Sequence, residues 1–183
     1  MRRSFRRIWQ NTRGVTSLEF ALILPVIAIL AAGTIEFGRL VILTQKLQNG
    51  TFILADLAAR DKTLSVGQLD SLFLALDNII QPFDFDTEGT AIVTGIRVDS
   101  SGDPVINWQR SGAGTLVAAS EIGAPGEVAA LPAALTATEG ETIIVSEVFY
   151  DFEPIFGLSA SPGVFRKVAY VKPRLGTLET LLP

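Results

Sequence analysis

Near its amino terminus the chain carries an uncharged apolar run that needs a membrane or a large core to cover it. Phe20 to Ile35 are sixteen residues without a charged side chain. A helix that spans a bilayer core needs about 20 apolar residues, so the run is slightly short alone, but the wider stretch Val15–Leu43 is long enough. The sequence therefore predicts one transmembrane helix near the amino terminus. Pro25 lies inside it and is expected to kink the helix or unwind it locally.

Two acidic residues bracket the run. Glu19 and Glu36 are seventeen residues apart, which is roughly 26 Å along a helix and close to the hydrocarbon thickness of a bilayer. Each acid is therefore expected near one membrane interface. Arg39 follows Glu36 at i+3 on the same helix face. We predict that Glu36 and Arg39 pair where the helix leaves the membrane.

Charge is divided unequally along the chain. Residues 1–14 hold five of the 15 basic residues and no acid, which leaves ten basic residues against 19 acidic residues in the remainder. The positive-inside bias predicts that the basic amino terminus stays in the cytoplasm. The acidic remainder has no basic face for nucleic acid, so we expect no nucleic-acid partner.

Cysteine and histidine are absent from the sequence. Disulfides, His/Cys metal sites, the serine–histidine triad and the cysteine–histidine pair are therefore excluded. We expect no catalytic residues, no bound metal and no cofactor, and a protein that is not an enzyme.

The remaining sequence predicts an α+β domain after the membrane helix. The helical pattern continues to about residue 60, and a second amphipathic helix fits Val66–Ile80, where Pro82 would stop it. An antiparallel sheet of about four strands is expected from Thr90–Asp99, Val105–Arg110, Glu141–Phe152 and Val164–Lys172, with a long loop over 111–141 and a frayed tail from Pro173. The predicted divisions are a basic leader at 1–14, a transmembrane and amphipathic helix at 15–60, and an extracytoplasmic domain at 61–183.

Two groups of acidic residues resemble a calcium-binding loop and a catalytic carboxylate pair, but the residues around them do not support either site. Residues 84–89 begin like a calcium loop, but the twelfth position falls on Gly95 instead of a glutamate, so we expect a solvated acidic turn. Glu147, Asp151 and Glu153 share one strand parity and are expected to form an exposed face rather than a glycosidase pair. Apolar residues also fall on that side, so both faces of the strand could be partly covered.

The amino-terminal residues together resemble a known family. An Arg-rich leader ends in Arg13-Gly14, residues 15–22 read Val-Thr-Ser-Leu-Glu-Phe-Ala-Leu, and residues 35–39 read Ile-Glu-Phe-Gly-Arg. With Pro25 between them, residues 12–50 resemble the TadE/TadF-like minor pseudopilins of the tight-adherence (Flp-type) pilus system. Segments 150–154 and 170–174 are only loosely similar to the closing strands of such proteins. The resemblance implies a pilin-like fold with a long N-terminal transmembrane helix and a small antiparallel sheet domain.

The resemblance also implies how the chain is processed and which partners it contacts. A membrane prepilin peptidase would cut between Gly14 and Val15. The new α-amino group on Val15 would then pair with Glu19, in its own helix or in a neighbouring subunit, and so support assembly. The expected partners are the prepilin peptidase, other pilin or pseudopilin subunits, the pilus assembly machinery and membrane lipid. The expected location is the bacterial inner membrane, with one pass and a cytoplasmic amino terminus.

Simpler interpretations remain open from the sequence alone. Glu19 could simply be an acid that stabilises the first turn of a membrane helix. Glu36 could simply be an acid whose side chain reaches the outer interface, and Gly14 could be an ordinary flexible residue. Arg2-Arg3 resembles a twin-arginine signal, and residues 31–33 offer an ordinary signal-peptidase site. An uncleaved, signal-anchored extracytoplasmic binding module is the main alternative function, and an anchored enzyme that uses carboxylates is a weaker one.

Overall fold

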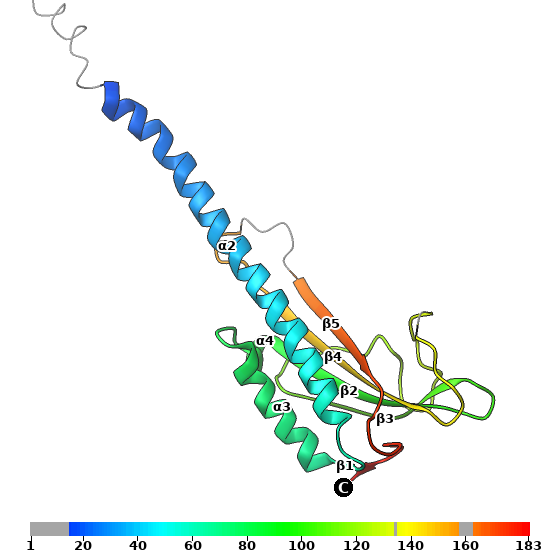
Figure 1. The fold of residues 1–183 in the computed structure, drawn as a ribbon. Helices are drawn as coiled ribbons and strands as arrows, with labels where there is room; N and C mark the ends of the chain where they lie inside the picture. The colour runs from blue at the N-terminus through cyan, green and yellow to red at the C-terminus, as the bar shows by residue number, and fades with distance from the viewer. Residues whose placement is uncertain (1–14, 134, 158–162) are drawn as a thin grey trace, which may run out of the picture. The chain divides into compact units, whose positions relative to one another are not determined.

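The computed structural model describes residues 15–133, 135–157 and 163–183 (Figure 1). Its elements are α2 (Val15–Ala58), β1 (Leu64–Ser65), α3 (Val66–Ile80), α4 (Phe85–Glu88), β2 (Gly89–Val98), β3 (Pro104–Gly112), β4 (Thr142–Phe152), β5 (Gly163–Val171) and β6 (Leu181–Leu182). A long amino-terminal helix followed by an antiparallel sheet confirms the predicted α+β class.

The chain divides into two compact units. The first comprises Met1–Arg39 with Pro154–Ser161, and the second comprises Leu40–Glu153 with Pro162–Pro183. This division follows spatial contacts, whereas the predicted divisions at residues 14 and 60 follow the order of the sequence and stay predictions.

Helix α2 runs without interruption through Pro25 and Gly50. Gly50 allows α3 to approach closely, because a Cβ atom at this position would lie 2.8 Å from Leu76 Cδ1. A glycine that weakens the helix locally therefore serves the packing of two helices.

Helix α3 has the predicted bounds because local signals define both ends. Ser65 and Gln68 form a capping box: Gln68 N donates to Ser65 Oγ at 3.2 Å, and Ser65 N donates to Gln68 Oε1 at 2.9 Å. The helix ends at Ile80, two residues before Pro82.

The main sheet has the strand order β3-β2-β4-β5, and every neighbouring pair is antiparallel. Its strands begin and end within one or two residues of the predicted positions. The β2–β3 hairpin closes on Asp99, whose Oδ1 accepts from Ser101 N at 2.8 Å and from Asp103 N at 2.9 Å. Strands β2 and β4 are buried along almost their whole length, because they lie at the centre of the sheet.

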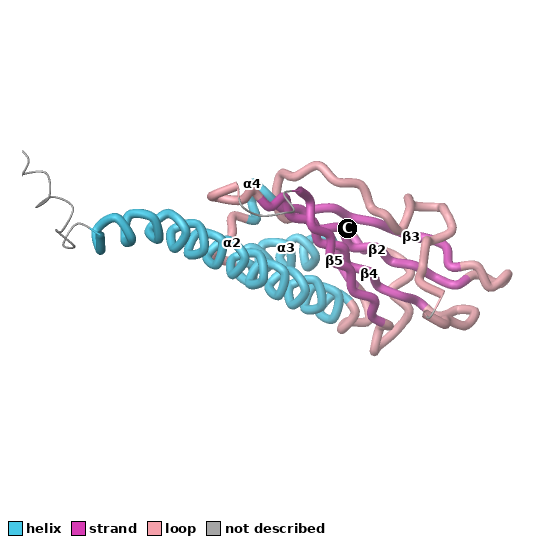
Figure 2. Tube along the Cα trace, turned by 90° about the horizontal axis from the view of Figure 1, so that it is seen from above, coloured by secondary structure: helices cyan, strands magenta, loops and turns pink. Residues whose placement is uncertain are grey.

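Both faces of this sheet are covered, each by a different part of the second unit (Figure 2). One face packs against the carboxy-terminal part of α2 and against α3, with a core that includes Leu43, Leu47, Leu54, Leu69, Phe73, Ala91, Val93, Ile144 and Val148. A buried polar contact joins helix and sheet there, since Ser146 Oγ donates to the Thr51 carbonyl at 2.6 Å. The opposite face carries Ile96, Ile143 and Val145, which pack against Ile122 and Ala129 of the long loop.

The prediction of a frayed tail from Pro173 is wrong. Strand β6 pairs in parallel with β1, and Leu178 is buried. Trp108 Nε1 donates to the Leu178 carbonyl at 3.0 Å, and Thr142 Oγ1 donates to the Thr177 carbonyl at 2.6 Å. The tail is held by hydrogen bonds to residues far away in the sequence, which its own apolar pattern does not reveal.

The prediction of an exposed Glu147 is also wrong. Its side chain is fully buried because the loop between β3 and β4 lies over that face of the sheet. Glu147 Oε1 accepts from Arg166 Nη2 at 2.7 Å, from Arg166 Nε at 2.9 Å and from the Glu121 backbone N at 3.1 Å, while Oε2 accepts from Ser120 Oγ. We call Glu147 together with Ser120, Glu121 and Arg166 the buried acid cluster, in which Glu147 is the buried acid and Glu121 is exposed.

The other acidic candidates have structural roles or lie at the surface. Asp84 caps the short helix α4, accepting from Thr87 N at 3.2 Å, so residues 84–89 are a capped turn. Glu153 is exposed as predicted, and Asp151 is partly exposed. Burial raises the pKa of Tyr170, which lies on the same sheet face as the buried acid cluster.

Candidate functional site

The candidate functional site is the part of α2 that lies in the first unit. Its large apolar side chains are exposed rather than packed: Val15, Leu18, Phe20, Leu22, Ile23, Leu24, Val26, Ile27, Ile29, Leu30 and Ile35. None of its most apolar 18-residue window is buried, so this segment is not the core helix of a globular domain. Within the described ranges it is the one helix long and apolar enough to cross a membrane, judged by length and composition.

Val15 and Glu19 lie one helical turn apart at the start of this segment. Both are exposed, and residues at i and i+4 share a helix face with about 5–6 Å between their Cβ atoms. Glu19 is the fifth residue of α2 as described, which places it beyond the first turn. Across residues 15–133, 135–157 and 163–183, no hydrogen bond or ion pair involves the Glu19 carboxylate. Gly14, the other half of the predicted cleavage site, lies outside the described residues.

Glu36 lies in a buried, hydrogen-bonded environment. Only 2% of the residue is exposed, and its Oε2 accepts a hydrogen bond from the Phe156 backbone N at 2.9 Å. Its Oε1 is buried and has no hydrogen-bond partner in the described part of the chain. Phe156 follows β4 in the connection to β5 and belongs to the same unit as Glu36. The pairing of Glu36 with Arg39 stays a prediction.

Sequence reasoning missed the contact between Glu36 and Phe156. The two residues are 120 positions apart, and no periodic pattern connects them. A usable signal was present nonetheless, because Pro154 to Gly163 contains no charged residue although it joins two strands at a loop. Its Pro, Gly and Ser residues are ordinary turn formers, so the signal lies in its large apolar residues Ile155, Phe156 and Leu158.

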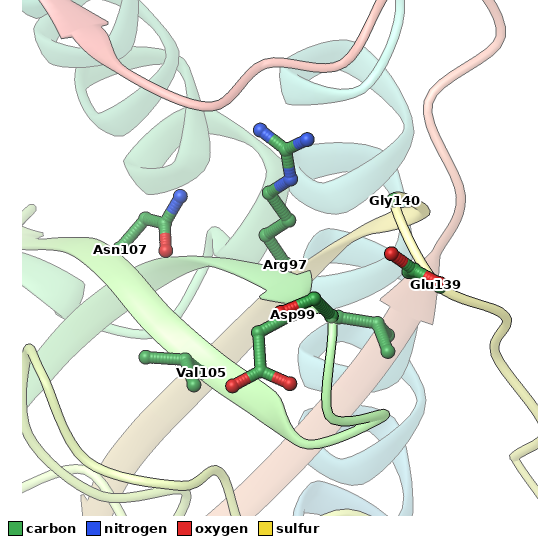
Figure 3. A pocket seen from close by; sticks show the side chains of 8 residues that line it. Arg97, Asp99, Val105, Asn107, Glu139 and Gly140 are labelled. Carbon is green, nitrogen blue, oxygen red and sulfur yellow. The ribbon is translucent and has the colours of Figure 1, made fainter.

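The hollow at the end of the β2–β3 hairpin is lined by polar side chains, most of which make contacts within the fold. It is about 510 Å³ in volume and is lined by Arg97, Asp99, Val105, Asn107 and Glu139, among others (Figure 3). Arg97 forms an ion pair with Glu179, Asn107 donates to the Glu179 carbonyl, and Asp99 closes the hairpin turn. These polar groups therefore hold the tail and the turn. Within the described residues, no group of three or more acidic side chains is placed to hold a metal ion.

Comparison with protein families identifies the amino-terminal segment. Residues 14–56 match the family model described as TadE-like protein. This segment is TadE-like. The match covers less than a quarter of the 183 residues, and it contains all five predicted site residues from Gly14 to Arg39. It confirms the resemblance seen in the sequence and suggests a protein associated with the tight-adherence pilus.

No curated protein and no solved structure matches the chain. The TadE-like match thus concerns α2 and does not extend into the sheet.

Proposed function

We propose that this chain is a pseudopilin-like membrane protein that takes part in assembly of a tight-adherence (Flp-type) pilus. One observation carries the proposal: the TadE-like segment forms a continuous helix whose apolar side chains are uncovered over the length of a bilayer core. Such a helix needs lipid before assembly and other helices afterwards.

In this proposal a prepilin peptidase cuts between Gly14 and Val15. Cleavage creates an α-amino group on Val15, one turn from the exposed carboxylate of Glu19. With no partner for Glu19 among the described residues, the amine of the same or a neighbouring subunit supplies the opposite charge. A buried pair of this kind contributes to specificity and register more than to stability, because desolvation offsets the attraction.

Helix packing supplies the contact area between subunits. Gly33 and Gly38 have no atom within 4 Å of where a Cβ would lie, so a neighbouring helix can approach the backbone closely there. The protein spans the inner membrane once, with its basic amino terminus in the cytoplasm and its sheet domain outside. It performs no chemistry of its own and is the substrate of a peptidase.

Intact-mass measurement of protein extracted from membranes tests the processing step. We expect a mature chain that begins at Val15, and we expect Gly14→Leu to retain all fourteen leader residues. Gly33→Ala, a change at a glycine within α2, should mature normally. A wild-type chain that retains Met1 would instead support an uncleaved, signal-anchored binding module, and one that begins at Thr34 would indicate ordinary secretion.

Glu19→Ala separates processing from assembly. We expect its leader to be removed as in the wild type, while its incorporation into pili or pilus subcomplexes falls, since the Val15 amine loses its partner. Co-purification with the other pilus subunits measures incorporation, and Glu139→Ala, at an exposed acid of the sheet domain, is the matched control. Unchanged incorporation of Glu19→Ala would show that this acid has no role in assembly.

A further inference from the structure

The connection between β4 and β5 presents apolar side chains at a defined position along α2. Ile155 is 62% exposed and Phe156 is 50% exposed, although both are large and apolar. They lie in a stretch without charge from Pro154 to Gly163. Exposed apolar residues grouped on one loop usually mark a contact surface.

Glu36 fixes the level of this loop relative to the apolar helix. The helix offers 21 residues from Val15 to Ile35, or about 31 Å of rise, which matches a hydrocarbon core of about 30 Å. Glu36 is the next residue, so it lies at the level where the span ends. Because Phe156 N donates to Glu36 Oε2 at 2.9 Å, the loop backbone lies at that same level.

We propose that the first part of the β4–β5 connection, residues 154–157, contacts lipid, which places Ile155 and Phe156 in the boundary between headgroups and acyl chains of the leaflet where α2 leaves the membrane. Aromatic and aliphatic side chains suit that layer, and the carboxylate that accepts from the loop backbone, that of Glu36, is buried. Phe37, 68% exposed and adjacent to Glu36, adds a third large apolar side chain at this level.

The Glu36 carboxylate is the positioning group in this arrangement. Its burial would be costly without a donor, and the Phe156 N–H supplies one. This hydrogen bond holds the loop backbone at the helix while the side chains of Ile155 and Phe156 remain exposed. The proposal rests on the membrane insertion of α2 that the proposed function requires.

Site-specific fluorescence tests the depth of the loop in the full-length protein. The sequence contains no cysteine, so single variants Ile155→Cys, Ile27→Cys and Val117→Cys can each carry one environment-sensitive NBD label. Val117 is 95% exposed in the loop of the second unit and reports the aqueous side. The labelled proteins are reconstituted at low protein density in phosphatidylcholine–phosphatidylglycerol vesicles. Quenching is measured with aqueous dithionite and with lipids that carry nitroxides at shallow or deep positions.

We expect the label at residue 155 to react with dithionite severalfold more slowly than that at residue 117, and to be quenched best by shallow nitroxides. The label at residue 27 should be quenched best by deep nitroxides. If residue 27 is deep but residue 155 behaves like residue 117, the lipid-contacting loop is refuted and the anchor stands. If residue 27 is also aqueous, the membrane anchor itself fails.

Two further comparisons test whether lipid or a neighbouring subunit contacts the loop, and whether Glu36 positions it. Protection of residue 155 that appears only at high protein density would assign the loop to a neighbouring subunit and overturn the lipid proposal. Glu36→Leu in the Ile155→Cys background should lose the protection, whereas Glu36→Gln, which keeps an acceptor oxygen, should retain most of it. Full protection in Glu36→Leu would show that Glu36 does not position the loop.

Discussion

Removing Arg166 should destabilise the sheet domain more than removing any exposed cation. Arg166 donates two hydrogen bonds, at 2.7 and 2.9 Å, to the Oε1 of Glu147, a residue with 0% exposure. The substitution Arg166→Met keeps most of the side-chain volume but leaves a buried carboxylate without its cation. Breaking a buried pair in this way costs about 3–5 kcal/mol of unfolding free energy. This is a large part of the stability of a domain of this size.

A second substitution should recover much of this loss. In Glu147→Gln/Arg166→Met the buried group is neutral, and its amide oxygen can still accept from the Glu121 backbone N. The remaining loss is expected to be about 1–2 kcal/mol, the cost of weakened neutral hydrogen bonds. The double variant should therefore be more stable than Arg166→Met alone, although it lacks more of the native interactions.

Urea unfolding of the full-length protein in detergent micelles measures these differences. Trp108, 8% exposed in the core, is the fluorescent probe in a Trp9→Phe background. Arg97→Met is the matched control, because Arg97 and Glu179 are both 38% exposed and such pairs contribute about 0–1 kcal/mol. A double variant no more stable than Arg166→Met would refute the reasoning, since an uncompensated buried charge would then not be the cause of the loss.

Two smaller perturbations test packing and pH dependence. Gly95→Ala places a Cβ 2.2 Å from the Trp108 indole and should lower the free energy of unfolding by about 1–3 kcal/mol in the same urea assay. The control Gly67→Ala, with open space around it, should be neutral or slightly stabilising. Equal effects of the two substitutions would contradict the packing argument. The hydrogen bond from Lys172 and then the backbone hydrogen bond from Thr138 lower the pKa of the Glu141 carboxyl below its ordinary 4.5. Its stabilising contribution is therefore present above pH 4.5 and is lost as the pH falls through the lowered value. Glu141→Gln should flatten the pH dependence of unfolding below pH 4.5, and an unchanged profile would contradict the assignment.

Local patterns predicted the elements whose ends carry local signals. The bounds of α3 follow from a capping serine at residue 65 and a proline at residue 82, and the β2–β3 hairpin follows from the turn residues around Asp99. The TadE-like segment could be recognised because its motif is continuous in sequence.

Contacts between distant segments were beyond the sequence patterns. Glu147 was assigned to an exposed face because strand parity describes one strand, whereas its burial depends on a loop about 27 residues earlier. The tail was expected to fray because its hydrogen bonds to Trp108 and Thr142 lie 70 and 35 residues away. For the same reason, the environment of Glu36 could not be predicted without knowing where Phe156 lies.

The central place of β4 in the sheet has a consequence for how the chain folds as it is synthesised. β4 pairs with both β2 and β5, yet it begins only at Thr142. Until it emerges, one side of β2 remains an open strand edge, and the helix face that carries Leu43 and Leu47 lacks much of its cover. Helix α3 and the first hairpin can form early, but the core closes only when the last quarter of the chain arrives. A nascent chain that stalls before residue 142 is therefore expected to aggregate more readily than the complete chain and to bind chaperones.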